Sequence, residues 1–311
     1  MNKRIVLALG GNALGDNPAA QKAAVKVAAK AIADLVQDGN QVVITHGNGP
    51  QVGMIKLAME TANKHNGSLP EMPMYDCVAM SQGYIGVDIQ NELREELIRR
   101  GIPKPVVTVV TQIVVDEKDP AFSDPTKPIG AFYSEEEARE MIARGYEFKE
   151  DSGRGWRRVI ASPKPIETIE AETVRILLEA GQIPIAAGGG GVPVIKGEGD
   201  SLVSVNAIID KDFASAKLAE ELGADMLVIL TAVEKVALNY RKPDERLLSE
   251  MSVEAAERYT LEGHFAPGSM LPKVEASVGF VKTGHGRSAL ITLLAKAKEA
   301  LEGKTGTVIH K

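Results

Sequence analysis

Residues 41–53 decide the fold, and they read QVVITHGNGPQVG. The apolar run Gln41–Ile44 is typical of a short buried strand, and the segment Met54–Met59 that follows the quoted stretch indicates a helix. A glycine-rich turn therefore stands where a strand passes into a helix. In open α/β sheets, ligands bind at such points because backbone N–H groups converge there on a helix N-terminus, and glycine leaves no side chain in the way. The stretch predicts an α/β fold that binds a small anionic group at a strand end.

The same alternation of strand and helix patterns continues along most of the chain, and it predicts a mostly parallel sheet with helices on both faces. Residues 116–165 interrupt it with several prolines, a charged helix expected over Ser134–Arg144 and the basic segment Arg154–Arg158, and we expect them to form a small flap. The expected strands are Arg4–Leu9, Gln41–Ile44, Pro105–Val110, Ile183–Ala186 and Met226–Leu230, and the expected helices are Ala19–Gln37, a segment ending near Asn66, Ser81–Arg100, Ile166–Glu179, Phe213–Leu222, Ser252–Tyr259 and Leu271–Lys282, followed by strand–helix–strand over Ala289–His310.

Composition narrows the classes of partner. The 311 residues are enough for one large α/β domain or for two lobes. A net charge of −6 provides no global field that would attract nucleic acid or an acidic membrane, and an aromatic content of 4% disfavours binding of nucleic acid by stacking. We therefore expect small-molecule substrates, no nucleic acid and no membrane, with local lysines holding any anionic substrate.

Cysteine usage and the apolar segments indicate the compartment. The single Cys77 excludes an intramolecular disulfide and a thiolate metal cluster, which favours a reducing, cytoplasmic location. The start Met1–Leu9 runs directly into Gly10-Gly11-Asn12 and predicts a first strand rather than a signal peptide. Glycines and prolines break the longest weakly polar run, Ile183–Ile195, so it cannot span a bilayer, which needs about 20 apolar residues.

Two further glycine-rich segments follow expected strands. Gly10-Gly11-Asn12 either permits close approach of a phosphate or makes a plain tight turn, and the residues alone leave both open. Gly188–Gly191 is costly in chain entropy, which favours a functional role over simple turning. The glycines of the opening stretch are spaced one residue too far apart for the dinucleotide fingerprint, and the sequence holds no Walker A motif. Any use of ATP therefore lies outside the P-loop class.

Lysines occur in three motifs that fit a phosphate. Asp210-Lys211-Asp212 precedes an expected helix, where an aspartate either caps the helix or holds lysines or a metal in place. Lys273 stands near the positive end of a helix that Ser269 is expected to cap, where it is either solvated or stabilised by a neighbouring anion. Lys127-Pro128-Ile129-Gly130 is a flap loop that is either solvated or carries Lys127 inward as part of a lid. The five histidines show no ligand spacing, so we expect no metal site built from protein side chains.

The ordered set of motifs runs through nearly the whole chain: Leu9–Ala13, His46–Gly53, Lys127–Gly130, Trp156–Val159, Ser162–Pro165, Ala187–Gly191, Asp210–Asp212 and Gly268–Lys273. In this order they resemble the amino acid kinase family, and within it the carbamate kinase branch. Many family members, such as the acetylglutamate kinases, carry a lysine two residues before the first glycine pair, where this chain has Ala8. The carbamate kinase branch lacks that lysine and uses the lysine of Asp-Lys-Asp, which is Lys211 here.

The resemblance implies a three-layer αβα sandwich with a small protruding flap, a single domain over residues 1–311. Residues 1–205 would form an acceptor lobe, with the flap inserted at about 116–165, and residues 206–311 a nucleotide-binding lobe. It also implies a homodimer and the reversible reaction of ATP with carbamate to ADP and carbamoyl phosphate, with Mg²⁺ carried by the nucleotide. Such enzymes usually run toward ATP in catabolism of the arginine deiminase type, and some synthesise carbamoyl phosphate.

The resemblance assigns roles to the motif residues. Lys211 and Lys273 on the nucleotide side and Lys127 from the flap would neutralise charge on the transferred group, while Asp212, with Asp210 as a second candidate, would orient the lysines. Backbone N–H groups that bind carbamate and the phosphoryl group would come from Gly10, Gly11, Asn12, Gly47, Asn48 and Gly49. The nucleotide would contact Asp210, Lys211, Thr231, Val233, Val236, Tyr240, Met270, Pro272 and Lys273.

Two other functions compete with this one. A neighbouring kinase that acts on another small acid is disfavoured by Ala8. A non-catalytic nucleotide sensor on the same fold is disfavoured by Lys127, Lys211 and Lys273, because a pure binder has no need of lysines on both sides of a transferred group.

Overall fold

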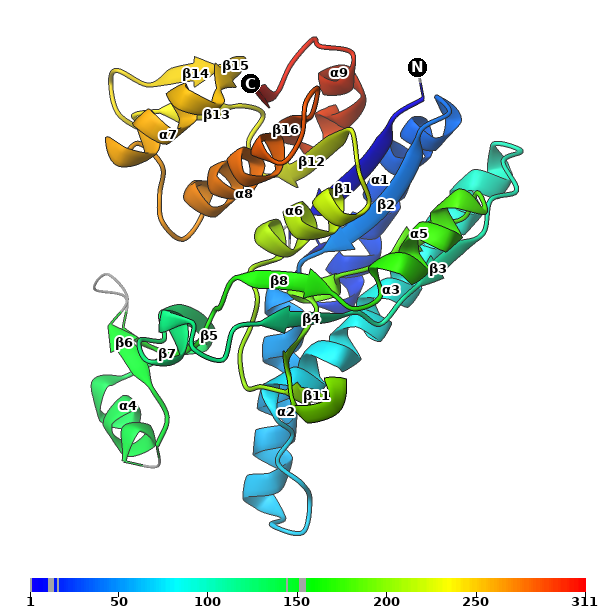
Figure 1. The fold of residues 1–311 in the computed structure, drawn as a ribbon. Helices are drawn as coiled ribbons and strands as arrows, with labels where there is room; N and C mark the ends of the chain where they lie inside the picture. The colour runs from blue at the N-terminus through cyan, green and yellow to red at the C-terminus, as the bar shows by residue number, and fades with distance from the viewer. Residues whose placement is uncertain (1, 11–13, 16, 144, 151–154) are drawn as a thin grey trace.

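The computed structural model describes residues 2–10, 14–15, 17–143, 145–150 and 155–311. Within these residues an eight-stranded sheet runs through the molecule (Figure 1). Neighbouring strands pair in parallel, except that β16 and β17 pair antiparallel. The mostly parallel sheet predicted from the sequence is therefore confirmed. In spatial order the strands are β15 (Glu250–Ser252), β17 (Thr307–His310), β16 (Ser288–Leu293), β12 (Met226–Thr231), β1 (Arg4–Leu9), β2 (Gln41–His46), β9 (Ile183–Ile185) and β3 (Val106–Thr108).

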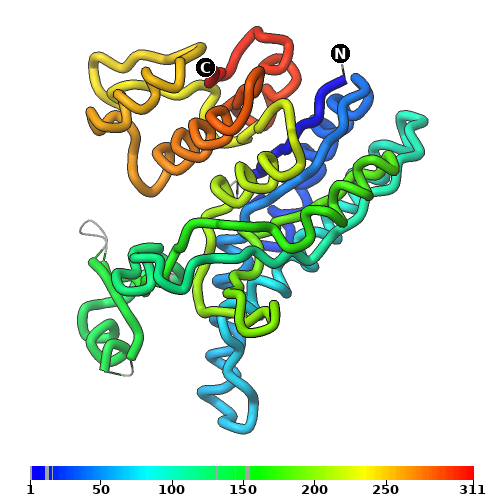
Figure 2. Tube along the Cα trace, viewed as in Figure 1, coloured from blue at the N-terminus to red at the C-terminus, as the bar shows by residue number. Residues whose placement is uncertain are grey.

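Helices cover both faces of this sheet because successive strand residues point to opposite faces. On β1, Ile5, Leu7 and Leu9 are buried in one apolar cluster, and Val6 and Ala8 in another. The three-layer αβα sandwich is thus confirmed, and both termini lie at the same end of it (Figure 2). The first cluster is closed by α1 (Pro18–Gln37), α3 (Met74–Arg99) and α9 (Ala297–Leu301), and the second by α5 (Ala171–Glu179), α6 (Lys211–Glu221), α7 (Val253–Leu261) and α8 (Met270–Lys282).

A second sheet extends the half of the molecule that carries β3 and β9. It packs through Val114, Val192 and Val194 against Val52 of α2 (Gly49–His65) and against the first turns of α3. This sheet was not expected from the sequence. Its strands, in spatial order, are β11 (Leu202–Ser204), β10 (Val192–Lys196), β4 (Gln112–Val115) and β8 (Pro165–Thr168).

The predicted flap protrudes from the body as a three-stranded antiparallel sheet (Figure 1). A capping box, formed by Ser134 and Glu137, begins its helix. The flap consists of β5 (Lys127–Tyr133), β7 (Trp156–Ile160), β6 (Phe148–Glu150) and α4 (Glu135–Ile142). The remaining elements are the hairpin of β13 (Val236–Leu238) and β14 (Arg246–Leu248) and the 3₁₀ turns η2 (Pro120–Phe122), η3 (Gly188–Gly190), η4 (Glu198–Asp200) and η5 (Leu294–Lys296).

The helix expected over Ile166–Glu179 is wrong at its start. Residues 165–168 form β8, because the register of this strand pairs Thr168 with Ile113 of β4, and only residues 171–179 are helical. A distant strand therefore overrides the local pattern. None of the helices in the described part of the chain has the length and apolar character needed to cross a membrane.

Three other boundaries differ from expectation. The glycine-rich turn is shorter, because β2 continues to His46 and α2 already begins at Gly49. The helix expected from Ser81 starts at Met74, whose side chain is buried against the second sheet. The flap segment Lys127–Gly130, expected as a loop, belongs to β5, which begins at Lys127.

Candidate active site

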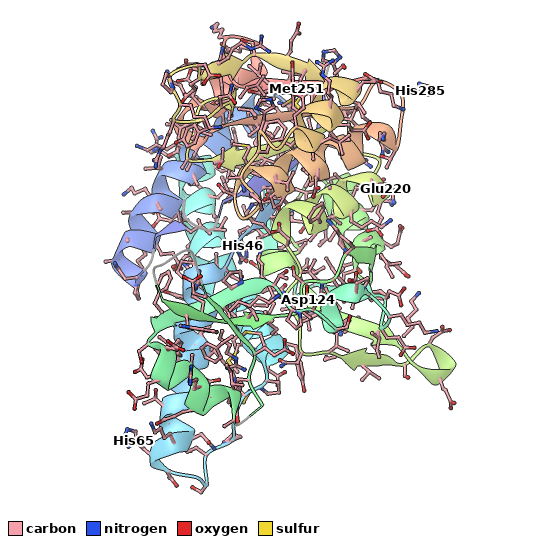
Figure 3. The ribbon with its side chains drawn as sticks, turned by 90° about the vertical axis from the view of Figure 1, so that its left-hand side faces the viewer. His46, His65, Asp124, Glu220, Met251 and His285 are labelled. Atoms are coloured by element: carbon pink, nitrogen blue, oxygen red, sulfur yellow. The ribbon has the colours of Figure 1, made fainter. Side chains whose placement is uncertain are left out.

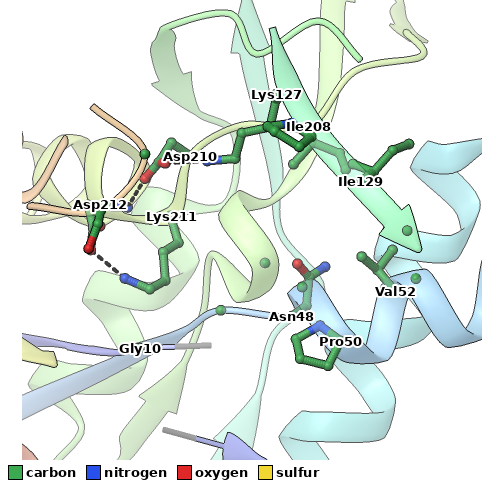
Figure 4. Close-up of a pocket in the computed structure, with 18 of the residues that line it drawn as sticks. Gly10, Asn48, Pro50, Val52, Lys127, Ile129, Ile208, Asp210, Lys211 and Asp212 are labelled. Atoms are coloured by element: carbon green, nitrogen blue, oxygen red, sulfur yellow. Dashed lines mark hydrogen bonds and ion pairs between the residues drawn. The ribbon is translucent and has the colours of Figure 1, made fainter. Parts of the chain in front are cut away.

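The carboxyl ends of four neighbouring strands open into a cavity of about 1260 Å³ (Figure 4). Thr231 ends β12, Gly10 follows β1, Gly47 follows β2 and Gly189 follows β9, and all four line the cavity. This is the edge at which parallel α/β sheets bind ligands. The glycine-rich strand ends singled out in the sequence thus meet in space, although Gly11 and Asn12 lie outside the described residues.

The turn between β2 and α2 presents a helix N-terminus to the cavity. Asn48 is the N-cap residue and Gly49 begins the helix, so the N–H groups of the first turn have no acceptor within it. The Asn48 side chain is buried, and its Nδ2 donates to Ser81 Oγ at 2.8 Å. Residues 47–49, hereafter the acceptor loop, therefore hold a fixed conformation.

Two of the predicted backbone donors are already used by the sheet. The N–H of Gly10 donates to the carbonyl of Leu230 at 3.1 Å, and the N–H of Gly47 donates to the carbonyl of Leu9 at 3.0 Å. The assignment of free N–H donors therefore does not hold for Gly10 and Gly47. Both residues stay in the cavity wall, where the absence of a side chain permits close approach.

The glycine run after β9 packs against both halves of the site. A Cβ added to Gly188 would lie 2.5 Å from Nε2 of His46, and one added to Gly189 would lie 2.1 Å from Nδ2 of Asn48. A Cβ on Gly190 would lie 2.1 Å from the carbonyl oxygen of Ile209. The run therefore packs between the acceptor loop and the segment that leads into α6. Side chains at these positions would clash, which explains why adjacent glycines stand here despite their cost in chain entropy.

Lysines from three separate elements converge on two aspartates at the cavity. Figure 4 shows two of them, Lys127 and Lys211, beside Asp210 and Asp212. Asp212, which is 2% exposed, accepts hydrogen bonds from Nζ of Lys211 in α6 and, at 3.0 Å, from Nζ of Lys273 in α8. Asp210 accepts a hydrogen bond at 2.6 Å from Nζ of Lys127 in β5. Each lysine thus has a carboxylate that orients it.

Asp210 combines the two roles that the sequence left open. Its Oδ1 accepts the N–H of Asp212 at 2.9 Å and caps α6, while its Oδ2 binds Lys127. Burial, the largest single influence, raises the pKa of Asp210, but the charge and hydrogen bond of Lys127, together with Lys211, outweigh it and lower that pKa to about 2. The carboxylate is therefore ionised at any working pH.

The start of α8 differs in detail from expectation. Ser269 occupies the N-cap position, but its side chain makes no capping hydrogen bond. Instead, its carbonyl oxygen accepts a hydrogen bond from Lys273 Nζ at 3.2 Å. Gly268 and Ser269 both line the cavity, so the helix start and its lysine face the same space.

The predicted nucleotide contacts fall into two groups. Thr231 lines the cavity together with the lysine–aspartate residues, whereas five others do not appear among the described lining residues. Those five, which stay predictions, are Val233, Val236, Tyr240, Met270 and Pro272. Ala232, beside Thr231, also lines the cavity, and so do residues 293–295, which the sequence interpretation missed. They could have been found as continuations of the apolar strands β12 and β16, which are neighbours in the sheet.

The sequence interpretation also did not predict the residues that line the opposite end of the cavity. Beside the acceptor loop stands an apolar wall of Val52, Ile129 and Ile208 (Figure 4). Farther along α2 and the flap, charged side chains line the cavity, among them Lys56, Glu60, Arg157 and Arg158. These residues lie on elements already implicated, but no local spacing brings them together.

His46 ends β2 just before the acceptor loop and is not among the described residues that line the cavity. It is fully buried, and burial lowers its pKa to about 4, so the ring is neutral. Its Nδ1 lies 2.9 Å from the carbonyl oxygen of Gly47. His65 and His285 lie far from it (Figure 3). Among the described residues, no group of three or more His, Cys, Asp or Glu side chains is arranged to hold a metal ion.

Comparison with known proteins places this geometry in context. The sequence profile of the amino acid kinase family matches residues 3–292. A carbamate kinase-like protein of Escherichia coli K12 is 61% identical over 309 residues, 99% of each chain. A carbamate kinase of Clostridium perfringens is 50% identical over 314 residues, covering 99% of this chain and all of that one. The structure of carbamate kinase from Giardia lamblia bound to AMP-PNP superimposes with a TM-score of 0.92 at 42% identity, covering 100% of this chain and 99% of that one.

Proposed function

The chain belongs to the amino acid kinase family, and from this premise we propose that it catalyses the carbamate kinase reaction, ATP + carbamate ⇌ ADP + carbamoyl phosphate. Full-length relatives that bear the name carbamate kinase support this activity. The observation that carries it is the convergence of Lys127, Lys211 and Lys273 on a cavity lined by three glycine-rich strand ends.

The lysines supply the charge that phosphoryl transfer requires. A protein does little covalent chemistry in this reaction; it aligns the substrates and neutralises charge on the moving group. Lys211 and Lys273, both held by Asp212, would contact the nucleotide phosphates. Lys127, held by Asp210, would reach the transferred group from the flap side. Because the lysines come from separate elements, they would provide positive charge on both sides of the transferred group.

The acceptor would lie at the acceptor loop. The N-terminus of α2 offers N–H groups and a partial positive charge, which suit a carboxylate or a carbamoyl phosphate oxygen. No general base is needed because carbamate is already an anion. With the N–H groups of Gly10 and Gly47 committed to the sheet, Asn48 and Gly49 are the described residues of this set that would donate to the substrate.

Two lobes would meet along this cavity. In the described residues, β1, β2, β3 and β9 come from the proposed acceptor lobe, 1–205, while β12, β15, β16 and β17 come from the proposed nucleotide lobe, 206–311. Ala8 is buried on the face of β1 that packs on α6, which Lys211 begins. Lys211 would therefore supply the charge that other family members place at position 8. The AMP-PNP complex of the relative from Giardia lamblia supports nucleotide binding.

Mg²⁺ would enter with the nucleotide. Asp210 and Asp212 are carboxylates at the transfer end of the cavity, and both are committed to lysines, so phosphate oxygens rather than a protein cage would hold the ion. When bound, the ion would neutralise charge on the phosphates. The lysine–aspartate pairs would orient those phosphates around it.

A coupled assay tests this function. The purified protein is given ADP, Mg²⁺ and carbamoyl phosphate, and ATP is detected by hexokinase and glucose-6-phosphate dehydrogenase. We expect ATP to form from carbamoyl phosphate, and no ADP to form from ATP with acetylglutamate. Absence of ATP production from carbamoyl phosphate would contradict the proposal. The same assay run in both directions measures whether synthesis of ATP or of carbamoyl phosphate is favoured.

We also propose a cytoplasmic homodimer. Met80, Val87 and Ile98 are 37%, 47% and 62% exposed on α3. At 3.6 residues per turn, these three positions lie within about 20° of one line along the helix. An exposed apolar line beside the edge strand β3 suits a second copy of the chain. Val87→Asp should shift the mass measured by light scattering from dimer to monomer, whereas Ile176→Asp on α5 should not.

A further inference from the structure

A network of charges joins the flap to α2. Arg158 of β7 donates through Nη1 to Glu60 Oε1 at 2.8 Å. Lys56 Nζ lies 3.2 Å from the same oxygen, is 8% exposed as a side chain and also donates to the carbonyl of Met72 at 2.7 Å. Beyond it, Lys56 binds Glu71, whose carboxylate also accepts from the Tyr146 hydroxyl at 3.1 Å. Three segments of the chain are therefore tied together at this point.

The positive charges of this network are already paired with carboxylates and are therefore not available to an anionic ligand. Lys56 and Arg158 are matched by Glu60 and Glu71, and the guanidinium of Arg158 is covered by the Tyr146 ring at 4.1 Å. Ion pairs of this kind add little net stability, because desolvation of the charges offsets their attraction. Their directional hydrogen bonds instead fix the relative position of the two elements that carry them. The arrangement is that of a positioning device rather than of a binding site.

The network connects directly to β5, the strand that carries Lys127. In the β5–β7 ladder Arg158 pairs with Ile129, and Ile160 pairs with Lys127. Residues two apart share a face of a strand, so Lys127, Ile129 and Arg158 face the same side of the flap sheet, about 7 Å apart along each strand for a two-residue step. All three line the cavity. A shift of Arg158 would therefore move Lys127 with it.

The other side of the network connects to the acceptor loop. Lys56 and Glu60 lie on α2, whose first residue, Gly49, belongs to that loop. Strand β5 also crosses α2 closely, since a Cβ added to Gly53 would lie 3.9 Å from Cα of Gly130. The charge network thus fixes α2 and β5 relative to each other. The distance between the acceptor and Lys127 depends on that arrangement.

We propose that Lys56, Glu60 and Arg158 form a positioning clamp that holds the flap against α2 and so sets the distance between Lys127 and the acceptor loop. The inference rests on the proposed function, because it assigns the clamp to the delivery of Lys127. These three residues line the cavity, but in this proposal their role is to hold the flap rather than to bind a substrate. They act on turnover through Lys127.

Kinetics of clamp variants test the connection. Arg158→Gln and Glu60→Gln should each lower kcat for ATP formation about ten- to a hundredfold, as misplacement of a catalytic group does, with KM for ADP unchanged because Lys211 and Lys273 are untouched. Arg158→Lys should recover part of the loss. Lys149→Gln is the matched control, because it breaks a flap ion pair with Asp124 that does not involve α2; its kcat should equal that of the wild type.

A double-mutant cycle separates positioning from general damage. In a Lys127→Ala background, Arg158→Gln should add no further loss of kcat, because the residue through which it acts is gone. A loss that multiplies with that of Lys127→Ala would overturn the proposal, and so would wild-type kcat in Arg158→Gln. If circular dichroism shows that Arg158→Gln does not fold, Glu60→Gln and Arg158→Lys carry the same test.

A spectroscopic readout is independent of the reaction. Trp156 is the only tryptophan of the sequence and lies on β7, two residues from Arg158. Acrylamide should quench its fluorescence more strongly in Arg158→Gln than in the wild type or in Lys149→Gln. Salt at about 1 M should raise quenching of the wild type toward the variant, because it screens the ion pairs. Equal quenching in all forms would overturn the clamp, whereas a wild type that makes no ATP from carbamoyl phosphate would refute only the proposed function.

Discussion

Replacement of Asp212 by asparagine is the most informative single change in this site. The side chain of Asp212 is 3% exposed and binds two lysines whose side chains are 12% and 15% exposed. Asp212→Asn keeps the shape but removes the negative charge. Lys211 and Lys273 then face each other across a neutral amide in a poorly solvated space. We expect both lower stability and lower activity.

The magnitude follows from the burial of the cluster. Removal of one partner of a buried ion pair costs about 3–5 kcal/mol, because a charge is left uncompensated. The melting temperature of a large domain changes by about 2–4 °C per kcal/mol, and a chain of 311 residues lies near the lower end of this range. The melting temperature should therefore fall by about 6–10 °C. Loss of lysine orientation should lower kcat about a hundredfold, the effect of one preorganised electrostatic group.

The assay combines thermal unfolding with the coupled ATP measurement. ADP carries the anionic oxygens that Asp212 normally supplies, so ADP should raise the melting temperature of Asp212→Asn more than that of the wild type. Asp34→Asn is the matched control, because it breaks an ion pair with Arg100 on the α1–α3 face, away from the cavity. That control should lose some stability but keep its kcat and its response to ADP.

Two results would refute this reasoning. An unchanged melting temperature without ligand would show that the lysines do not depend on Asp212 for charge compensation. A normal kcat in a folded Asp212→Asn protein would show that their orientation does not limit phosphoryl transfer.

Further predictions concern individual residues around the site. Lys211→Ala and Lys273→Ala should each lower kcat about a hundredfold or more in the coupled assay while the fold, checked by circular dichroism, is retained. Lys127→Ala should lower kcat while the Kd for ADP measured by calorimetry stays within about threefold, since its Nζ binds on the flap side of the cavity. His46 has its pKa lowered from 6.5 to about 4 by burial, so the unfolded chain binds more protons between these values and stability falls as pH drops through that window, by up to about 3 kcal/mol; urea titrations at pH 7 and pH 4.5 should show this loss in the wild type and a smaller one in His46→Gln. Cys77 is fully buried, and burial raises the pKa of its thiol. Ellman's reagent should therefore leave the folded enzyme active, and it should react with the single thiol of the chain only after the protein is unfolded in urea.

Local patterns predicted much of the fold because strand and helix signals depend on residues that are close together in the sequence. The apolar runs of β1 and β2 and the glycines after β1, β2 and β9 identified strands and the edge of the sheet at which the cavity lies. The helix over residues 166–170 was wrong for the opposite reason. Its conformation depends on pairing with β4, whose residue Ile113 is far away in sequence.

The sequence by itself determined the composition of the site: which lysines, aspartates and glycines stand at strand ends and helix starts. Only the tertiary structure decided how they are paired. Lys127 reaches Asp210 across 83 residues, and Lys273 reaches Asp212 across 61, while Gly10 and Gly47 give their N–H groups to neighbouring strands rather than to a ligand. The physical reason is that propensity and periodicity act within one or two turns, whereas charge pairing depends on how separate elements pack. The hydrogen bond from Arg158 to Glu60 also depends on how separate elements pack.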